Sequence, residues 1–456
     1  MLLTTYQLLL TKRKKMSFKQ WKAYWKKIDW TRKWFAVFIL LRPIVDNFYK
    51  LKEISSFLSP IYIMGVLTPI LCISAMVSMR NKKENGTGDE LFRFFGIIIL
   101  LNCLMLLISF YSFDTLGNCI KYVTPPLVFF YLRKAVRDKE DLHFILQTFL
   151  YSCIFPFGMM FYEVIFGAIT PEYASVGRGG GARIRGEYAD SMNYASFLVG
   201  SFLVVAYFFL EGLHKKSKMP HVNITRLVIW VFVSFVMAIS LRHVSTWAVF
   251  LTLIILLLYF NSKNLKGLVV VIFVLSLTLP FFARSIYQTQ IYPLIAKEFN
   301  VINGDQEVQY AFNGRVSRWE RYFEIWNRMP GIAQYLGVSF SGFRQAPVMV
   351  GGGMHNDYIR LLFLSGIVGV VLYIFFFFFV FWRRKFLQPP EKFLVMGAVA
   401  IVMLYSVSTL PTIYPGIYFI AYPIYSFALL PVKQAYAAKV VKQKSRVTRP
   451  ETLAIE

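Results

Sequence analysis

The stretch that decides the fold is GGGMHNDYIRLLFLSGIVG, residues 351–369, in which a glycine triplet and a histidine lead into an apolar segment. The apolar residues continue through FFFFFV and stop at the basic cluster WRRK. An apolar run of about twenty residues is long enough to cross a bilayer as a helix. We therefore expect His355 to lie where a loop enters the membrane. The pattern leaves two interpretations of it open, a helix cap and a catalytic group.

Similar apolar runs occur along the whole chain. The sequence is 57% hydrophobic and only 16% charged, a composition typical of polytopic membrane proteins. It predicts an all-α membrane protein with about twelve spanning helices and a large outer-face loop between the ninth and tenth. The expected spans are 34–50, 55–79, 91–113, 118–133, 142–167, 193–212, 225–242, 244–260, 266–284, 355–382, 392–410 and 414–431.

Basic residues flank these runs and predict the topology. Much of the net charge of +26 lies in these flanks, which indicates cytoplasmic loops and contact with anionic lipid rather than with nucleic acid. The lysine-rich loops fall on one side together with both termini. We therefore expect a basic amphipathic cytoplasmic segment at 1–33, a membrane domain at 34–431 and a basic cytoplasmic tail at 432–456. Two longer segments, 168–192 and 285–354, are then expected at the outer face.

Arginine dominates the positive charge of these two outer segments. The first holds Arg178, Arg183 and Arg185, and the second holds Arg315, Arg318, Arg321, Arg328 and Arg344 against a single Lys297. A guanidinium is a planar fork of donors that suits bidentate binding of phosphate or carboxylate. The outer face is therefore expected to bind an anion.

The second outer segment also contains an expected amphipathic helix, GRVSRWERYFEIWNRMPG, residues 314–331. Arg315, Trp319, Tyr322 and Trp326 share one face of it at three- and four-residue spacings, and Pro330 ends the run. We expect this helix to lie on the membrane or on the helix bundle. The aromatic stripe indicates packing, whereas packing does not explain Arg315.

Motifs for metal and nucleotide chemistry are missing from the sequence. Its four cysteines have no paired spacing, and it contains no glycine-rich nucleotide loop with its lysine, no Asp-x-Asp pair and no Gly-x-Ser-x-Gly elbow. We therefore expect neither a metal nor a cofactor, and a substrate that is already activated. The glycine triplets 179–181 and 351–353 permit backbone N–H groups to converge on an anion. A flexible loop or a tight entry into a helix explains them as well.

A few polar residues at the expected outer face are candidates for chemistry. His243 and His355 are the histidines expected there, and an imidazole with a pKa of about 6.5 can take a proton from an alcohol. Arg242 ends the seventh span without an evident partner, and either a functional role or contact with lipid headgroups explains it. Arg42 and Asp46 lie one helical turn apart in the first span, so they can neutralise each other.

Several motifs together resemble the O-antigen ligase and polymerase family. The histidine motif is HNDYIRLLFLSGIVG, preceded by GRVSRWERYFEIW and PGIAQYLGVSFSGF. SLRHVSTWAVFL is similar to the Ser-Arg helix turn of the family, and RGEYADSMNYASFL is similar to the segment before it. Their order and the number of spans agree, so the resemblance covers roughly residues 30–430.

This resemblance implies a GT-C-type glycosyltransferase in the bacterial cytoplasmic membrane, active at its outer face. Such an enzyme moves a glycan from undecaprenyl diphosphate to a hydroxyl. The resemblance implies His355 as the general base and Arg242 and Arg315 as the residues that bind the diphosphate. The further candidates for substrate binding are Arg178, Arg183, Arg185, Arg318, Asn356, Arg42 and Asp46.

The sequence departs from the family pattern at two positions, and it leaves three functions open. His243 stands where the family usually has a small residue, which makes it a rival base, and Leu364 stands where the family often has an acid. LLRPIVDNFY and HNDYIR favour a polymerase, which extends another lipid-linked repeat unit, over a ligase, which transfers to lipid A-core or another acceptor. A carrier of small anions or lipid-linked sugar is less expected, because the polar candidates gather at the outer mouth and not near the midplane. A flippase and a chain-length regulator are further candidate partners.

Overall fold

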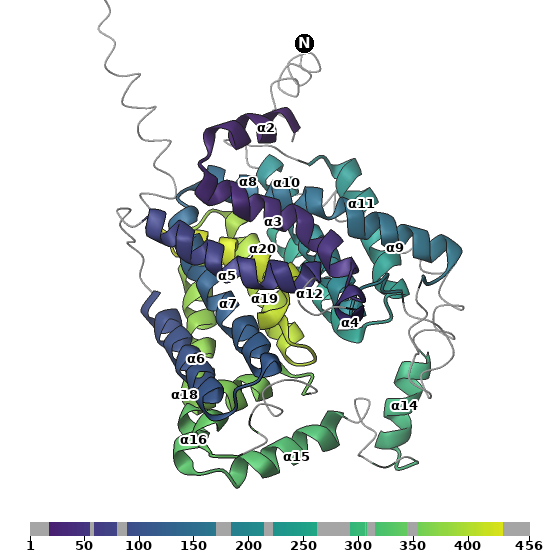
Figure 1. The fold of residues 1–456 in the computed structure, drawn as a ribbon. Helices are drawn as coiled ribbons and strands as arrows, with labels where there is room; N and C mark the ends of the chain where they lie inside the picture. The colour runs from purple at the N-terminus through teal and green to yellow at the C-terminus, as the bar shows by residue number, and fades with distance from the viewer. Residues whose placement is uncertain are drawn as a thin grey trace, which may run out of the picture.

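The computed structural model describes residues 18–54, 59–79, 89–169, 184–213, 222–261, 292–305, 307, 315–343, 346 and 354–431. All regular secondary structure in these residues is helical (Figure 1), so the expected all-α polytopic fold is confirmed. Seven segments of the described chain are long and apolar enough to cross a membrane. They are α5 (Pro60–Ser78), α6 (Asp89–Ser109), α8 with α9 (Lys139–Phe166), α10 (Ser191–Leu213), α12 (Val244–Asn261), α18 with its 3-10 extension (Asp357–Phe386) and α19 (Pro389–Ser406).

Four further helices coincide with expected spans and are shorter or more polar. They are α3 (Trp30–Asn47), α7 (Phe113–Ala135), α11 (Ile224–Ser240) and α20 (Pro415–Ala428). The ninth expected span, 266–284, lies outside the described residues. The segment 285–354 contributes α14 (Tyr292–Ile302), α15 (Arg315–Asn327) and α16 (Gly331–Leu336), and the N-terminal segment contributes α2 (Phe18–Lys27). Figure 1 shows α2 and α15 on opposite sides of the bundle.

The fifth expected span, 142–167, is confirmed as one apolar segment long enough to cross a membrane, and the structure divides it into two helices. α8 (Lys139–Ser152) ends one residue before α9 (Ile154–Phe166) begins, and Cys153 joins them. Pro156 explains the break, because it has no N–H to donate to the carbonyl of Ser152 and its ring crowds that carbonyl. The apolar composition continues across the break, so hydropathy alone does not reveal it.

α10 forms the centre of the bundle. Every residue from Ser191 to Glu211 is buried, and glycines on the neighbouring helices allow them to approach closely. A Cβ on Gly397 of α19 would lie 2.3 Å from Leu203, and one on Gly416 of α20 would lie 2.2 Å from Ser196. α19 and α20 therefore pack closely against α10 at these two glycines, which fixes the positions of both helices in the bundle.

Charged side chains buried in the bundle are paired between helices. Arg133 of α7 contacts Asp89 of α6 at 2.6 Å. Lys139 of α8 contacts Glu211 of α10 at 2.8 Å and Glu391 of α19 at 2.5 Å. Removing one partner of a buried pair leaves an uncompensated charge and costs about 3–5 kcal/mol, so these contacts fix the relative positions of the helix ends.

Candidate functional site

His355 immediately precedes α18, but it is not the cap of that helix. Asn356 is the cap: its side chain accepts a hydrogen bond from the N–H of Ile359 at 3.1 Å. The same side chain donates to the carbonyl of Val407 at 3.1 Å, which ties the start of α18 to the end of α19. The cap of α18 and its anchor to the end of α19 therefore belong to Asn356 and not to His355.

Arg242 and His355 share an unusual backbone conformation. Among the described non-glycine residues these two have a positive φ, 49° for Arg242 and 47° for His355. The left-handed region costs an L-residue about 1–2 kcal/mol, so the surrounding structure must hold both residues there. Such strain occurs preferentially at functional sites. The sequence motifs singled out the same two residues on independent grounds.

The turn that carries Arg242 is connected to α18 through the end of α19. His243, next to Arg242, shares its Nδ1 with the hydroxyl of Thr246 at 2.8 Å. Thr246 accepts a hydrogen bond from the hydroxyl of Tyr405 of α19 at 3.1 Å, and Tyr405 lies two residues before Val407, the partner of Asn356. Both strained residues therefore flank the same helix end.

Arg242 itself is half-buried. Burial lowers the pKa of its guanidinium below the ordinary value, because removing a charge from water disfavours the charged form. The direction of this shift indicates that the protein does not fully offset the loss of water around this cation.

α15 lies on the bundle, against the start of α18. The indole N–H of Trp319 donates to the carbonyl of Met354 at 3.2 Å, and the ring of Tyr322 packs edge-on against Phe363 with centroids 5.7 Å apart. Of the two expected positions for this amphipathic helix, membrane or bundle, the structure has the second. Arg315 lies one helical turn before Trp319 on the face that meets Met354, the neighbour of His355.

Two glycines and an asparagine hold α16, which follows α15, in place. α18 is kinked at Gly366, with φ 64°, and a Cβ there would lie 2.2 Å from the carbonyl carbon of Tyr335 at the end of α16. Gly337 follows α16 with φ 120°, and its Cβ would lie 2.3 Å from the side chain of Asn102 of α6. Asn102 donates to the carbonyl of Leu336 at 2.6 Å. α16 thus docks into the kink of α18, and the docking positions α15.

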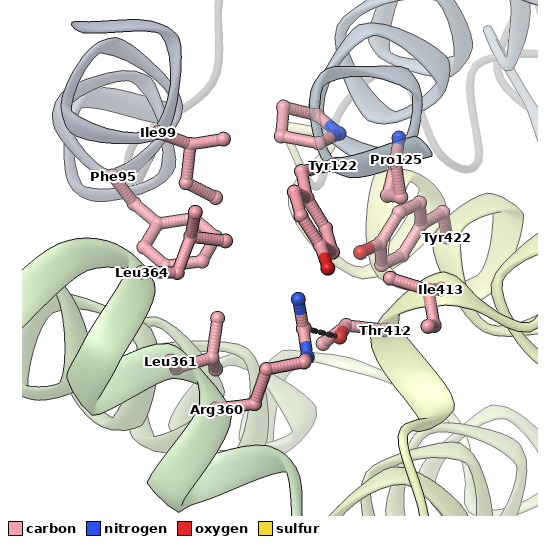
Figure 2. A pocket seen from close by; sticks show the side chains of 11 residues that line it. Phe95, Ile99, Tyr122, Pro125, Arg360, Leu361, Leu364, Thr412, Ile413 and Tyr422 are labelled. Carbon is pink, nitrogen blue, oxygen red and sulfur yellow. Dashed lines mark hydrogen bonds between the residues drawn. The ribbon is translucent and has the colours of Figure 1, made fainter. Parts of the chain in front are cut away.

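A buried charge pair anchors the first turn of α18 to the segment before α20. Arg360 contacts Asp357 at 2.6 Å, and Asp357 accepts from the backbone N–H of Thr412 at 3.0 Å and from its hydroxyl at 2.9 Å. Arg360 also donates to the hydroxyl of Thr412 and lies over the ring of Tyr122, 5.0 Å from its centroid (Figure 2). The sequence interpretation missed this pair, although an acid and a base three residues apart at the head of an apolar run are a visible signal.

The space beside Arg360 is too small for a glycan. It is lined mainly by apolar side chains, among them Phe95 and Leu364, and the buried Nη1 of Arg360 has no hydrogen-bond partner there (Figure 2). The cavity has room for about one water molecule. We therefore assign Asp357 and Arg360 to the support of the site.

The remaining sequence candidates divide into three groups. Arg42 and Asp46 form an ion pair at 2.8 Å, as their spacing predicts. Arg185 donates to the carbonyl of Ala189 at 3.0 Å, and Arg318 lies on α15. Arg178 and Arg183 lie outside the described residues, as do Arg344 and both glycine triplets. In the part of the chain that the structure describes, no group of three His, Cys, Asp or Glu side chains could hold a metal ion.

Comparison with known proteins identifies the segment that carries these candidates. The O-antigen ligase family matches residues 228–374, a segment that begins in α11 and ends in α18. It includes Arg242, Arg315 and His355, and also the Gly366 kink. The resemblance seen in the motifs is therefore confirmed over this segment. No curated protein matches the chain.

Proposed function

The chain carries an O-antigen ligase domain and so belongs with the O-antigen ligases and polymerases; on this premise we propose that it is a polysaccharide polymerase. It takes a glycan from undecaprenyl diphosphate and transfers it to a hydroxyl of another lipid-linked repeat unit, at the outer face of the bacterial cytoplasmic membrane. The observation that carries the proposal is the left-handed backbone shared by Arg242 and His355, which flank the same end of α19.

His355 acts as the general base in this proposal. Its imidazole takes the proton of the acceptor hydroxyl as the oxygen attacks the anomeric carbon of the donor glycan. The bond between that carbon and the diphosphate oxygen breaks, and the diphosphate leaves with the bonding electrons. Arg242 and Arg315 stabilise the negative charge that develops on the leaving group. A diphosphate leaves readily, so positioning, counter-charge and one base are sufficient.

The assignment of the base is tested with matched histidine variants. His355→Ala is expected to keep lipid-diphosphate binding and lose transfer by about 10²–10⁴-fold, the usual contribution of a general base. His243→Ala is the control, because His243 hydrogen-bonds hydroxyls of its own turn. Full transfer by His355→Ala together with loss in His243→Ala would assign the base to His243 instead.

A ligase is the second candidate, because the matched family is described by that activity. Purified chain in liposomes is incubated with a lipid-diphosphate repeat unit, with and without an added second acceptor. A ladder of increasing lengths identifies a polymerase, and transfer to the second acceptor alone identifies a ligase. Movement of intact lipid-linked glycan across the bilayer without transfer would contradict both and identify a carrier.

A further inference from the structure

Two cysteines that the proposed chemistry does not use face each other between two helices. Cys103 is on α6 and Cys119 is on α7, and both side chains are buried. The thiol of Cys119 donates to the carbonyl of Cys103, with sulfur and oxygen 3.5 Å apart, and the thiol of Cys103 donates to the carbonyl of Cys119 at 3.9 Å. Each thiol reaches the main chain of the other cysteine, so the two side chains lie alongside each other.

The packing of α6 on α7 explains why these cysteines meet. A Cβ on Gly96 of α6 would lie 3.4 Å from the Cβ of Pro126 of α7. Cys103 is seven residues after Gly96, and Cys119 is seven residues before Pro126, which is about two turns toward the same end of an antiparallel helix pair. In a disulfide the two Cβ atoms lie about 3.5–4.5 Å apart. The interface is as close as that at its glycine, and the crossed thiol contacts show that it stays close at the cysteines.

The water-sized cavity beside Arg360 lies in the same interface (Figure 2). It is lined by Ile99, one turn before Cys103 on α6, and by Tyr122, one turn after Cys119 on α7. Residues three or four apart share a helix face, so the cavity and the thiols follow one line of contact between the two helices. The buried Nη1 of Arg360 has no hydrogen-bond partner there. A small neutral molecule with oxygen acceptors suits this space, whereas a bulky reagent does not.

We propose that Cys103 and Cys119 are a modification site, at which hydrogen peroxide forms a disulfide that cross-links α6 and α7. One thiolate attacks a peroxide oxygen, the O–O bond breaks, and a sulfenic acid forms. The leaving hydroxide takes up the proton of that thiol and becomes water. The second thiolate then attacks the sulfenic sulfur, the S–O bond breaks, and a second water forms in the same way. The two thiols lose two electrons and two protons, and a dithiol can reduce the bond again.

The cross-link joins two helices that support the candidate site. Asn102, the neighbour of Cys103, donates to the carbonyl of Leu336 and so holds α16 in place. Tyr122 lies under the guanidinium of Arg360 in the first turn of α18. The disulfide therefore ties the helix that holds α16 to a helix that contacts α18. The modification does not depend on the reaction that the site performs.

The pairing is tested on the wild-type chain by mass spectrometry. Purified chain in liposomes is treated with hydrogen peroxide, denatured with N-ethylmaleimide to alkylate the remaining thiols, and digested. We expect one peptide pair, joined through Cys103 and Cys119 and separated by dithiothreitol. Cys72 and Cys153 should be alkylated; they are internal controls, because both are buried and the thiol of Cys153 contacts the carbonyl of Phe197 instead.

Three results of this experiment would overturn the proposal. They are a disulfide that contains Cys72 or Cys153, a disulfide between two chains, and alkylation of all four cysteines. The chain denatured in dodecyl sulfate is the positive control for the oxidant, because its thiols are accessible and should pair without selectivity. The concentration of peroxide is set by this control.

Matched variants test the order of the two steps. Cys103→Ser and Cys119→Ser should each abolish the cross-link, and Cys72→Ser should keep it. A sulfenic acid without a second thiol beside it persists long enough to be trapped by dimedone. We expect a dimedone adduct in at least one of the two variants that lack a cysteine of the pair. No adduct in either variant would contradict attack of peroxide on this site.

A denaturation measurement distinguishes a disulfide that fits the native packing from one that distorts it. Closing a loop of the chain disfavours the unfolded state. The oxidised wild type should therefore unfold at a higher dodecyl sulfate concentration than the reduced wild type, whereas Cys103→Ser treated with peroxide should not change. A lower midpoint for the oxidised wild type would show that the bond strains α6 and α7, and the proposal would then be wrong.

Discussion

Replacing His355 by alanine and by glycine tests its chemistry and its backbone in one experiment. Neither variant has a base, so both should lose transfer by about 10²–10⁴-fold. Their stabilities should differ, because φ at this residue is 47°. Alanine keeps a left-handed strain of about 1–2 kcal/mol, which glycine does not have. Glycine in turn loses about 0.5–1 kcal/mol more backbone entropy on folding. The glycine variant is therefore expected to be more stable by about 0.5–1 kcal/mol.

The sign of this difference is the decisive quantity, and a helical position provides the control. Arg318 lies inside α15, where glycine should be less stable than alanine by about 1 kcal/mol. Free energies of unfolding are measured for the four variants by titration with dodecyl sulfate in mixed micelles, followed by tryptophan fluorescence. Transfer is measured with the liposome ladder assay.

Two results would refute the reasoning about His355. If glycine is less stable than alanine at position 355 by as much as at position 318, the strained backbone that singles out His355 is absent. If the alanine variant keeps full transfer, the residue is not the base. The two results are independent, so the strain and the chemistry can be judged separately.

Three further predictions concern the support of the site and the cation beside it. Gly366→Ala should push α16 out of the kink and lower the free energy of unfolding by about 1–3 kcal/mol through overpacking. Transfer should also fall, although His355 is intact. An unchanged free energy of unfolding would contradict the docking of α16. Asp357→Ala should cost about 3–5 kcal/mol because it leaves the guanidinium of Arg360 uncompensated, and adding Arg360→Leu should recover more than half of the loss in the same titration. Arg242→Lys keeps the charge and loses the bidentate geometry. Transfer should therefore fall at least about tenfold, the effect of losing one hydrogen bond to a charged group. A wild-type rate of transfer in this variant would exclude a bidentate contact.

The helices could be predicted largely from composition, because a span needs about twenty apolar residues and few other patterns produce them. The ends of the helices and the breaks within them were harder to predict from composition. The pair α8 and α9 appeared as one span, since the break at Cys153 leaves the apolar run intact. The position of α15 was left open, because an amphipathic helix presents the same stripe to lipid and to protein. The contact of Trp319 with Met354 decides between them.

The site candidates could be predicted in part. His355 and Arg242 were accessible from motifs, because each lies at one end of an apolar run. Asn102 was missed, because its role depends on Leu336, which is 234 residues away in the sequence. Asp357 and Arg360 were missed for a different reason. Their charges stand three residues apart at the head of an apolar run, which is a local signal, and the rule that drew attention to Arg42 and Asp46 applies to them as well.

In this bundle, the cations that stabilise the fold differ from Arg242 in having a carboxylate partner among the described residues. Cations in its interior have a carboxylate of their own: Arg133 has Asp89 and Arg360 has Asp357. An uncompensated charge there would destabilise the fold whether or not substrate is present. Arg242 lies between α11 and α12 and is half-buried, so water can stabilise its charge until an anionic ligand replaces that water. In the proposed function the diphosphate is this ligand: it forms charge-assisted contacts that the free protein lacks, and the binding energy is then available to position the reacting groups around His355.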